Sequence, residues 1–171
     1  MTLSLVKPDV RYAKSHASYV AEFTAAGEPL VPWILLNIED DFHAYVERLN
    51  NQLTGNDSTR DFVANSSYWL LDDQEIVAVS NMRHHLTPAL LDYGGHIGYS
   101  VRPSRRSCGL AKQVLRLTLD RLRAIGVERA RLTCDKQNIA SASVIIANSG
   151  VLDSEALIKD TLVQRYWIPM V

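Results

Sequence analysis

Residues 101–115 read VRPSRRSCGLAKQVL, and this stretch connects an apolar run to an amphipathic helix through a turn rich in positive charge. Arg102, Arg105 and Arg106 lie within five positions, and Gly109 precedes the predicted helix. The first turn of an α-helix exposes unpaired N–H groups and carries positive partial charge. A glycine at such a point lets a ligand approach the backbone closely, because it has no Cβ. The stretch therefore predicts either an anion site or an ordinary solvated basic turn, and these arguments leave both open.

The segments around this stretch predict an α+β protein. Hydrophobic periodicity and turn residues predict helices over 12–26, from a cap at Asp40 or Asp41 to Leu53, over 110–125 and over 141–147. They predict strands over 68–71, 76–79, 96–101, 130–134, 151–158 and 162–168, with a hairpin turn at 72–75. The helix over 110–125 should turn one apolar stripe to the core, made by Leu110, Val114, Leu117, Leu122 and Ile125. This order of elements is typical of an α+β or mixed-sheet plan.

Composition restricts the classes of function. The 171 residues carry a net charge of −1, with 47% hydrophobic and 22% charged residues, as in ordinary globular proteins. This charge argues against general nucleic-acid binding, and no apolar stretch is long enough to span a bilayer. Cys108 and Cys134 are too few for a disulfide framework and are not spaced for zinc. Without a signal-peptide pattern or an internal linker, residues 1–171 are expected to form one cytoplasmic domain without a metal site.

The turn resembles a known signature. Arg106-Ser107-Cys108-Gly109-Leu110-Ala111 is similar to the Arg/Gln-x-x-Gly-x-Gly/Ala signature of the GCN5-related N-acetyltransferases, and Val101-Arg102-Pro103 resembles the strand end that precedes it there. Asn138, followed by Ser141 and Val144, resembles the second conserved block of the family. The stretches GGHIGYSVRP and LTCDKQNIAS also resemble a bacterial subgroup of predicted acetyltransferases. The resemblance is clear from about Gly94 to Gly150.

This resemblance implies a GNAT-like, mostly antiparallel central sheet flanked by helices, with acetyl-CoA as donor and a primary amine as acceptor. It implies that the diphosphate is held by the arginines and by six backbone N–H groups of the turn, those of Arg106, Ser107, Cys108, Gly109, Leu110 and Ala111. It further implies that Tyr99, Ser100 and Val101 run beside the pantetheine arm, and that the N–H of Val101 polarises the thioester. Asn138 would contact the cofactor near its reactive end. By analogy with the family, a homodimer is expected.

The chain departs from the family pattern at two positions. Ser107 stands where many members have glycine, which restricts the loop but leaves backbone contacts possible. Ile145 stands where many members have a tyrosine that protonates the departing thiolate. Tyr99 and Tyr166 are the candidates to replace it as general acid.

The general base is a separate question. A base that acts near neutral pH titrates in that range, and His96 lies on the predicted strand with such a side chain. A packed structural histidine is the alternative at this position, and water could relay the proton in its place.

The sequence therefore predicts an N-acetyltransferase that acts by direct attack of a small-molecule or amino-acid-like amine in a ternary complex. The alternative is a non-catalytic acyl-CoA-binding sensor or partner subunit, which the missing tyrosine would favour. A nucleotide or RNA binder that uses the three arginines would show a steep dependence on salt, and the overall charge weighs against it.

Overall fold

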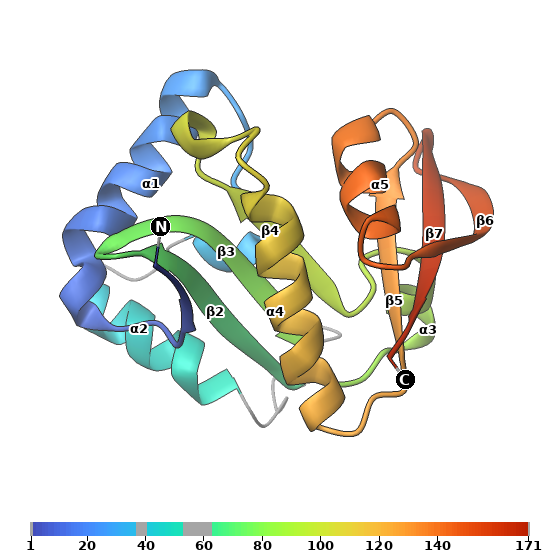
Figure 1. Cartoon of the computed structure of the whole chain (residues 1–171), viewed down its shortest axis with the longest axis horizontal. Helices are drawn as coiled ribbons and strands as arrows, with labels where there is room; N and C mark the ends of the chain where they lie inside the picture. The colour runs from blue at the N-terminus through green and yellow to red at the C-terminus, as the bar shows by residue number, and fades with distance from the viewer. Residues whose placement is uncertain (1, 37–40, 53–62, 171) are drawn as a thin grey trace.

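The computed structural model describes residues 2–36, 41–52 and 63–170, and within them the chain forms two antiparallel sheets. In the first, the order β1-β2-β3-β4 comprises Leu3–Val6, Asn65–Asp72, Glu75–Arg83 and Ile97–Val101. In the second, the order β5-β7-β6 comprises Arg129–Asp135, Thr161–Pro169 and Val151–Ile158. Figure 1 shows the two sheets side by side. The predicted α+β class, with antiparallel strands flanked by helices, is confirmed.

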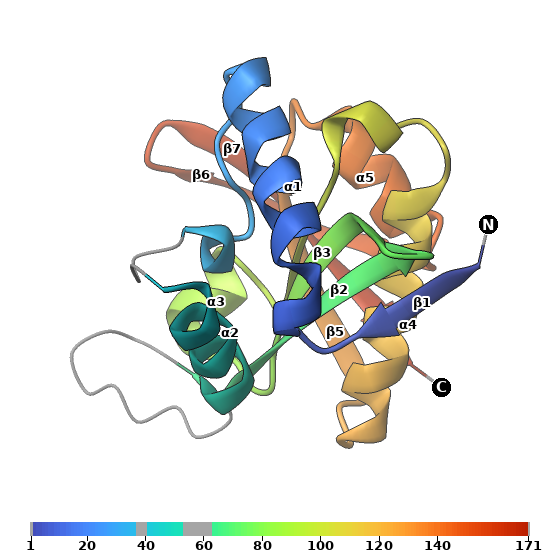
Figure 2. The same ribbon diagram turned by 90° about the vertical axis from the view of Figure 1, so that its left-hand side faces the viewer.

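Helices cover both faces of the four-stranded sheet. Helices α1 (Ala13–Ala26) and α2 (Phe42–Asn51) lie on one face, and α4 (Leu110–Ala124) lies on the other, as Figure 2 shows with α1 in front of β2 and β3. Helix α5 (Ile139–Ile146) packs on the three-stranded sheet, and the short α3 (Pro88–Asp92) precedes β4. One apolar cluster, which includes Met82, Leu119 and Tyr166, connects the two sheets beneath α4.

Local capping explains several helix boundaries. The Asp41 carboxylate accepts hydrogen bonds from the backbone N–H groups of His43 and Ala44, and so begins α2. Gly27 ends α1 in the left-handed conformation, with its N–H donating to the carbonyl of Thr24. The alternative cap at Asp40 and the predicted helix end at Leu53 lie outside the described residues.

Helix α4 turns a wider stripe to the core than predicted. Leu110, Val114 and Leu122 are buried as expected, and Leu115 and Leu119 join them. The prediction for Ile125 is wrong, because the helix ends at Ala124 and leaves Ile125 at the C-cap with 49% of its surface exposed.

The sheet is divided because β4 and β5 form no ladder with each other. Among the strands that the structure describes, β4 pairs with β3 alone, and β5 pairs with β7 alone. Some elements of the described residues were not predicted. Strand β1 and helix α3, with four and five residues, are too short to show a periodicity, and so are the three-residue 3-10 helices.

Candidate functional site

The two sheets are joined at one end of β4. The backbone N–H of His96 donates to the carbonyl of Arg131 at 2.7 Å, and the N–H of Arg131 donates to Nδ1 of His96 at 2.9 Å. Gly95 makes this approach possible, since a Cβ there would lie 2.4 Å from the carbonyl oxygen of Arg131. The backbone N–H of Gly94 adds a bond to the Thr133 hydroxyl. Beyond this junction, the edge of β4 is not paired with β5.

The hydrogen bonds on both sides of β4 show which backbone groups face this free edge. The N–H of Arg83 bonds to the carbonyl of His96, and the N–H of Arg102 bonds to that of Val77. In an antiparallel pair, bonded and non-bonded residue pairs alternate. Tyr99 and Val101 fall on the non-bonded positions, so their N–H and C=O groups point away from β3. The edge is therefore available for an extended ligand that binds like another strand.

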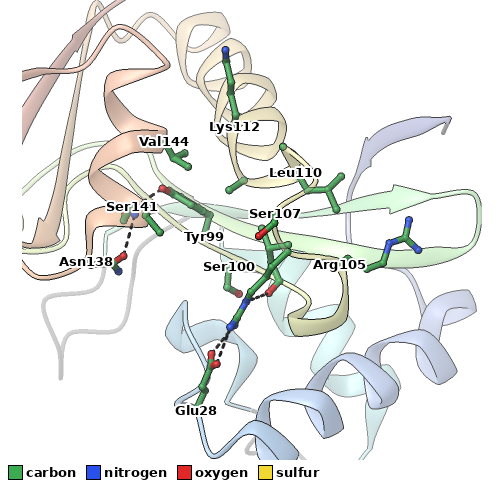
Figure 3. Close-up of a pocket in the computed structure, with 15 residues that line it drawn as sticks. Glu28, Tyr99, Ser100, Arg105, Ser107, Leu110, Lys112, Asn138, Ser141 and Val144 are labelled. Atoms are coloured by element: carbon green, nitrogen blue, oxygen red, sulfur yellow. Dashed lines mark hydrogen bonds and ion pairs between the residues drawn. The ribbon is translucent and has the colours of Figure 1, made fainter.

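A cavity of about 610 Å³ lies along this edge (Figure 3). Its walls come from the end of β4, from the turn that enters α4 and the first turn of that helix, and from α5 with its N-cap. Glu28, just after α1, adds a carboxylate from the opposite side. The lining residues are Glu28, Tyr99, Ser100, Val101, Arg105, Arg106, Ser107, Gly109, Leu110, Ala111, Lys112, Asn138, Ala140, Ser141 and Val144.

The turn before α4 has the geometry of an anion site. Ser107 and Gly109 both adopt the left-handed conformation, with φ of 61° and 76°. Gly109 is the N-cap, and no side chain of the described residues caps the first turn of the helix. The N–H groups of that turn are therefore free to bind a ligand, and the helix dipole favours a negative one.

Each arginine of the turn forms an ion pair with a carboxylate that is distant in the sequence. Arg102 is only 2% exposed and binds Glu22, Ser15, Ser18 and the carbonyl of Ile76 between α1 and β3.

Arg105 pairs with Asp72 and Glu75 of the β2–β3 hairpin. Arg106 pairs with Glu28, at 2.7 and 2.6 Å for the two nitrogen–oxygen contacts. Lys112, in the first turn of α4, is the remaining cation of the lining and forms no ion pair with a described residue.

Tyr99 and Ser141 meet at the other end of the cavity. The Tyr99 hydroxyl lies 3.2 Å from the Ser141 hydroxyl, and Figure 3 shows the two side chains directed toward each other. Burial raises the pKa of Tyr99 to about 12, so that its hydroxyl keeps its proton at neutral pH. The Oδ1 atom of Asn138 accepts the N–H of Ser141 and thereby caps α5.

The structure does not bring the other two predicted catalytic residues into the cavity. His96 is 6% exposed, its Nδ1 is occupied by Arg131, and burial lowers its pKa to about 4. Tyr166 is 2% exposed on β7 and donates its hydroxyl proton to Gln164. Ile145 packs in the apolar cluster beside Leu132, so this position faces the core and not the cavity.

Nine of the ten residues predicted to bind the cofactor line one cavity; the tenth, Cys108, is exposed and is not among its lining residues. Ser141 and Val144 belong to the quoted motif but were not predicted as lining residues. The contribution of Glu28 had no local signal, because it lies 78 positions from Arg106.

Within the described ranges, no three His, Cys, Asp or Glu side chains are grouped to hold a metal ion. No helix among the same residues is long and apolar enough to cross a membrane.

The sequence also matches the model of a known protein family. Residues 35–145 match the model of the acetyltransferase (GNAT) family. No curated protein sequence matches the chain.

Solved structures share the fold at low identity. A putative acetyltransferase, yncA, from Salmonella typhimurium with its cofactor acetyl-CoA has a TM-score of 0.65 and 12% identity, with 99% of this chain and 94% of that one covered. An acetyl transferase from the same organism, which modifies the N-terminal serine of ribosomal protein L7/L12, has a TM-score of 0.69 and 17% identity, with 100% of this chain and 96% of that one covered. A mutant of the spermidine N-acetyltransferase SpeG from Vibrio cholerae has a TM-score of 0.62 and 13% identity, with 99% of this chain and 95% of that one covered.

Proposed function

The chain belongs to the acetyltransferase (GNAT) family, and from this premise we propose that it transfers an acetyl group from acetyl-CoA to a primary amine. The acceptor is a small molecule or an amino-acid-like molecule, which attacks the thioester directly in a ternary complex. Among the similar structures, one contains acetyl-CoA, one acts on a protein N-terminus and one on spermidine.

The observation that carries the proposal is the cavity along the unpaired edge of β4. It combines a free strand edge, an uncapped helix N-terminus and the hydroxyl of a half-buried tyrosine within one lining. An extended arm with a diphosphate at one end and a thioester at the other matches this order of groups. The edge takes the arm by strand-like hydrogen bonds, and the first turn of α4 takes the diphosphate.

Each part of the donor has a partner in the chain. The N–H groups of the turn from Arg106 through Ala111 bind the diphosphate, assisted by the ammonium group of Lys112. The backbone of Tyr99 and Val101 binds the pantetheine arm, and the N–H of Val101 points toward the thioester carbonyl. That donor has its greatest effect when the amine attacks, because negative charge then develops on the oxygen.

The chemistry requires two proton movements. The amine nitrogen forms a bond to the carbonyl carbon while the carbon–sulfur bond breaks, and the sulfur leaves as a thiolate. Tyr99 supplies the proton that the thiolate takes, because its hydroxyl is protonated at neutral pH and lines the cavity beside Ser141. The proton lost by the amine passes to water, since the pKa of His96 near 4 makes that ring a weak base at neutral pH.

Tyr99→Phe tests this assignment, with Tyr166→Phe as the matched variant. Release of free thiol from acetyl-CoA is measured against a panel of primary amines, and coenzyme A affinity is measured by calorimetry. Loss of a general acid typically costs about a hundredfold or more in kcat. We expect that loss for Tyr99→Phe with coenzyme A affinity nearly unchanged, and wild-type kcat for Tyr166→Phe.

If Tyr166→Phe lost kcat and Tyr99→Phe kept it, the general acid would be Tyr166 on β7. A wild-type protein that binds coenzyme A but acetylates no amine would instead support a non-catalytic acyl-CoA sensor. Absence of any coenzyme A binding would overturn the proposed function itself.

A further inference from the structure

The charges around the cavity are unusual for a site that takes a polyanion. Among the described residues that line it, Glu28 is the carboxylate, and Arg105, Arg106 and Lys112 are the cations. Arg105 is held by two carboxylates of the hairpin. Glu28 therefore places negative charge beside a donor that itself carries phosphate groups, and it neutralises the nearest arginine.

The backbone fixes the position of Glu28. It follows Gly27, the C-cap of α1, and its N–H donates to the carbonyl of Phe23 at 3.0 Å. Its carboxylate binds both terminal nitrogens of Arg106, and Figure 3 shows this pair on the side of the cavity away from α5.

The pair lies next to the end of β4. The Nε atom of Arg106 is 3.4 Å from the carbonyl oxygen of Val101, whose N–H is assigned to the thioester. Glu28 is thus connected, through the Arg106 side chain, to the residue whose N–H is assigned to the thioester. Both side chains are about 40% exposed, at 42% for Arg106 and 39% for Glu28, so a ligand can compete for either one.

We propose that Glu28 is the acceptor-recognition residue of this site, and that it exchanges Arg106 for the ammonium group of the substrate when the donor diphosphate takes Arg106. This inference rests on the proposed function. It defines the acceptor class as amines that arrive positively charged. An ammonium group can take the place of Arg106 on Glu28, because the carboxylate otherwise loses its charge partner.

The exchange couples the two substrates. Without an acceptor, Glu28 competes with the diphosphate for Arg106 and weakens donor binding. With a cationic acceptor on Glu28, that competition ends, so each substrate increases the affinity of the protein for the other.

The test compares wild type with Glu28→Gln, and uses Glu128→Gln, an exposed carboxylate outside the cavity, as the control. Calorimetry measures the affinity of each protein for coenzyme A and for pantetheine, which lacks the diphosphate. Each measurement is made at low salt and at about 0.3 M salt. Steady-state assays use the cationic amine that wild type acetylates fastest. Unfolding curves verify that all variants are folded.

We expect Glu28→Gln to bind coenzyme A about two- to fivefold more tightly at low salt, with a smaller difference at high salt. Pantetheine affinity should not change, and the tighter binding of coenzyme A should disappear when Arg106→Gln is added. The KM for the amine should rise at least about fivefold, while kcat stays within about threefold.

Weaker coenzyme A binding in Glu28→Gln would overturn the inference, because Glu28 would then only brace the turn. An unchanged KM for the amine would also overturn it. Both results require a wild type that binds and uses acetyl-CoA, so they differ from a failure of the proposed function.

Discussion

His96→Asn separates the structural role of this ring from a catalytic one. In the fold, Nδ1 accepts the N–H of Arg131, and a ring 6% exposed cannot readily hold a charge. The Oδ1 atom of asparagine can occupy the place of Nδ1, so the variant keeps the bond to β5 but does not titrate. At neutral pH we expect wild type and variant to have free energies of unfolding within about 1 kcal/mol of each other.

The difference should develop in acid. Burial lowers the pKa of His96 from 6.5 to about 4, whereas the unfolded chain titrates near 6.5. A depressed folded-state pKa means that the unfolded state binds the proton first, so wild type keeps this stability above pH 6.5 and loses it as the pH falls toward 4. From these two pKa values, the loss is about 2 kcal/mol at pH 5 and about 3 kcal/mol at full protonation.

Urea unfolding of both proteins from about pH 7.5 to 5 measures this effect. His16, whose pKa burial also lowers to about 4, remains in the variant, so the variant retains part of the acid loss. We expect its free energy of unfolding to fall by about 2 kcal/mol less than that of wild type by pH 5. Parallel curves for the two proteins would refute the reasoning. Unchanged acetyl transfer by the variant would show in addition that His96 is not the base.

Four further substitutions test how the turn and the junction are built. Gly95→Ala should lower the free energy of unfolding in urea by about 3 kcal/mol, because its Cβ would lie 2.4 Å from the Arg131 carbonyl oxygen. Gly109→Ala has open space around it and should lower that free energy by only about 1 kcal/mol, for its positive φ. Equal losses for the two variants would contradict this. Ser107→Gly should raise stability by about 0.5 kcal/mol, since glycine adopts φ of 61° without strain, and an unchanged or lower melting temperature would count against that view. Arg102→Leu should destabilise by about 3 kcal/mol, because it leaves Glu22 without its buried partner, and a loss below about 1 kcal/mol would show that this network adds little.

Local features of the chain were readable before folding because they depend on neighbouring residues. Asp41 caps α2 with its own side chain, and Gly27 ends α1 through its backbone conformation. Asn138 caps α5 in the same way, although the sequence predicted that this helix begins only at Ser141. These signals act over a few positions, and the alternation of apolar residues acts over one element, so the order of helices and strands could be predicted.

The same holds for most of the donor site. The lining from Tyr99 to Ala111 is nearly continuous in sequence, and Asn138 belongs to a second short motif. A strand, a turn and a helix in succession bring the residues from Tyr99 to Ala111 together, whereas Asn138 reaches the cavity through the packing of α5. The exception, Cys108, turns its side chain outward at the middle of the turn.

Local patterns in the chain thus predict the helices, the strands and the backbone of the donor turn, because these depend on contacts within a short stretch. The partners of the charged and titratable side chains, in contrast, depend on the tertiary structure. Arg102 and Arg106 find their carboxylates 80 and 78 positions away on and just after α1, and His96 finds Arg131 across the junction of two sheets. The physical reason is that a charge or a ring nitrogen is satisfied by whichever group the fold places within hydrogen-bond distance, and no local pattern states which group that is.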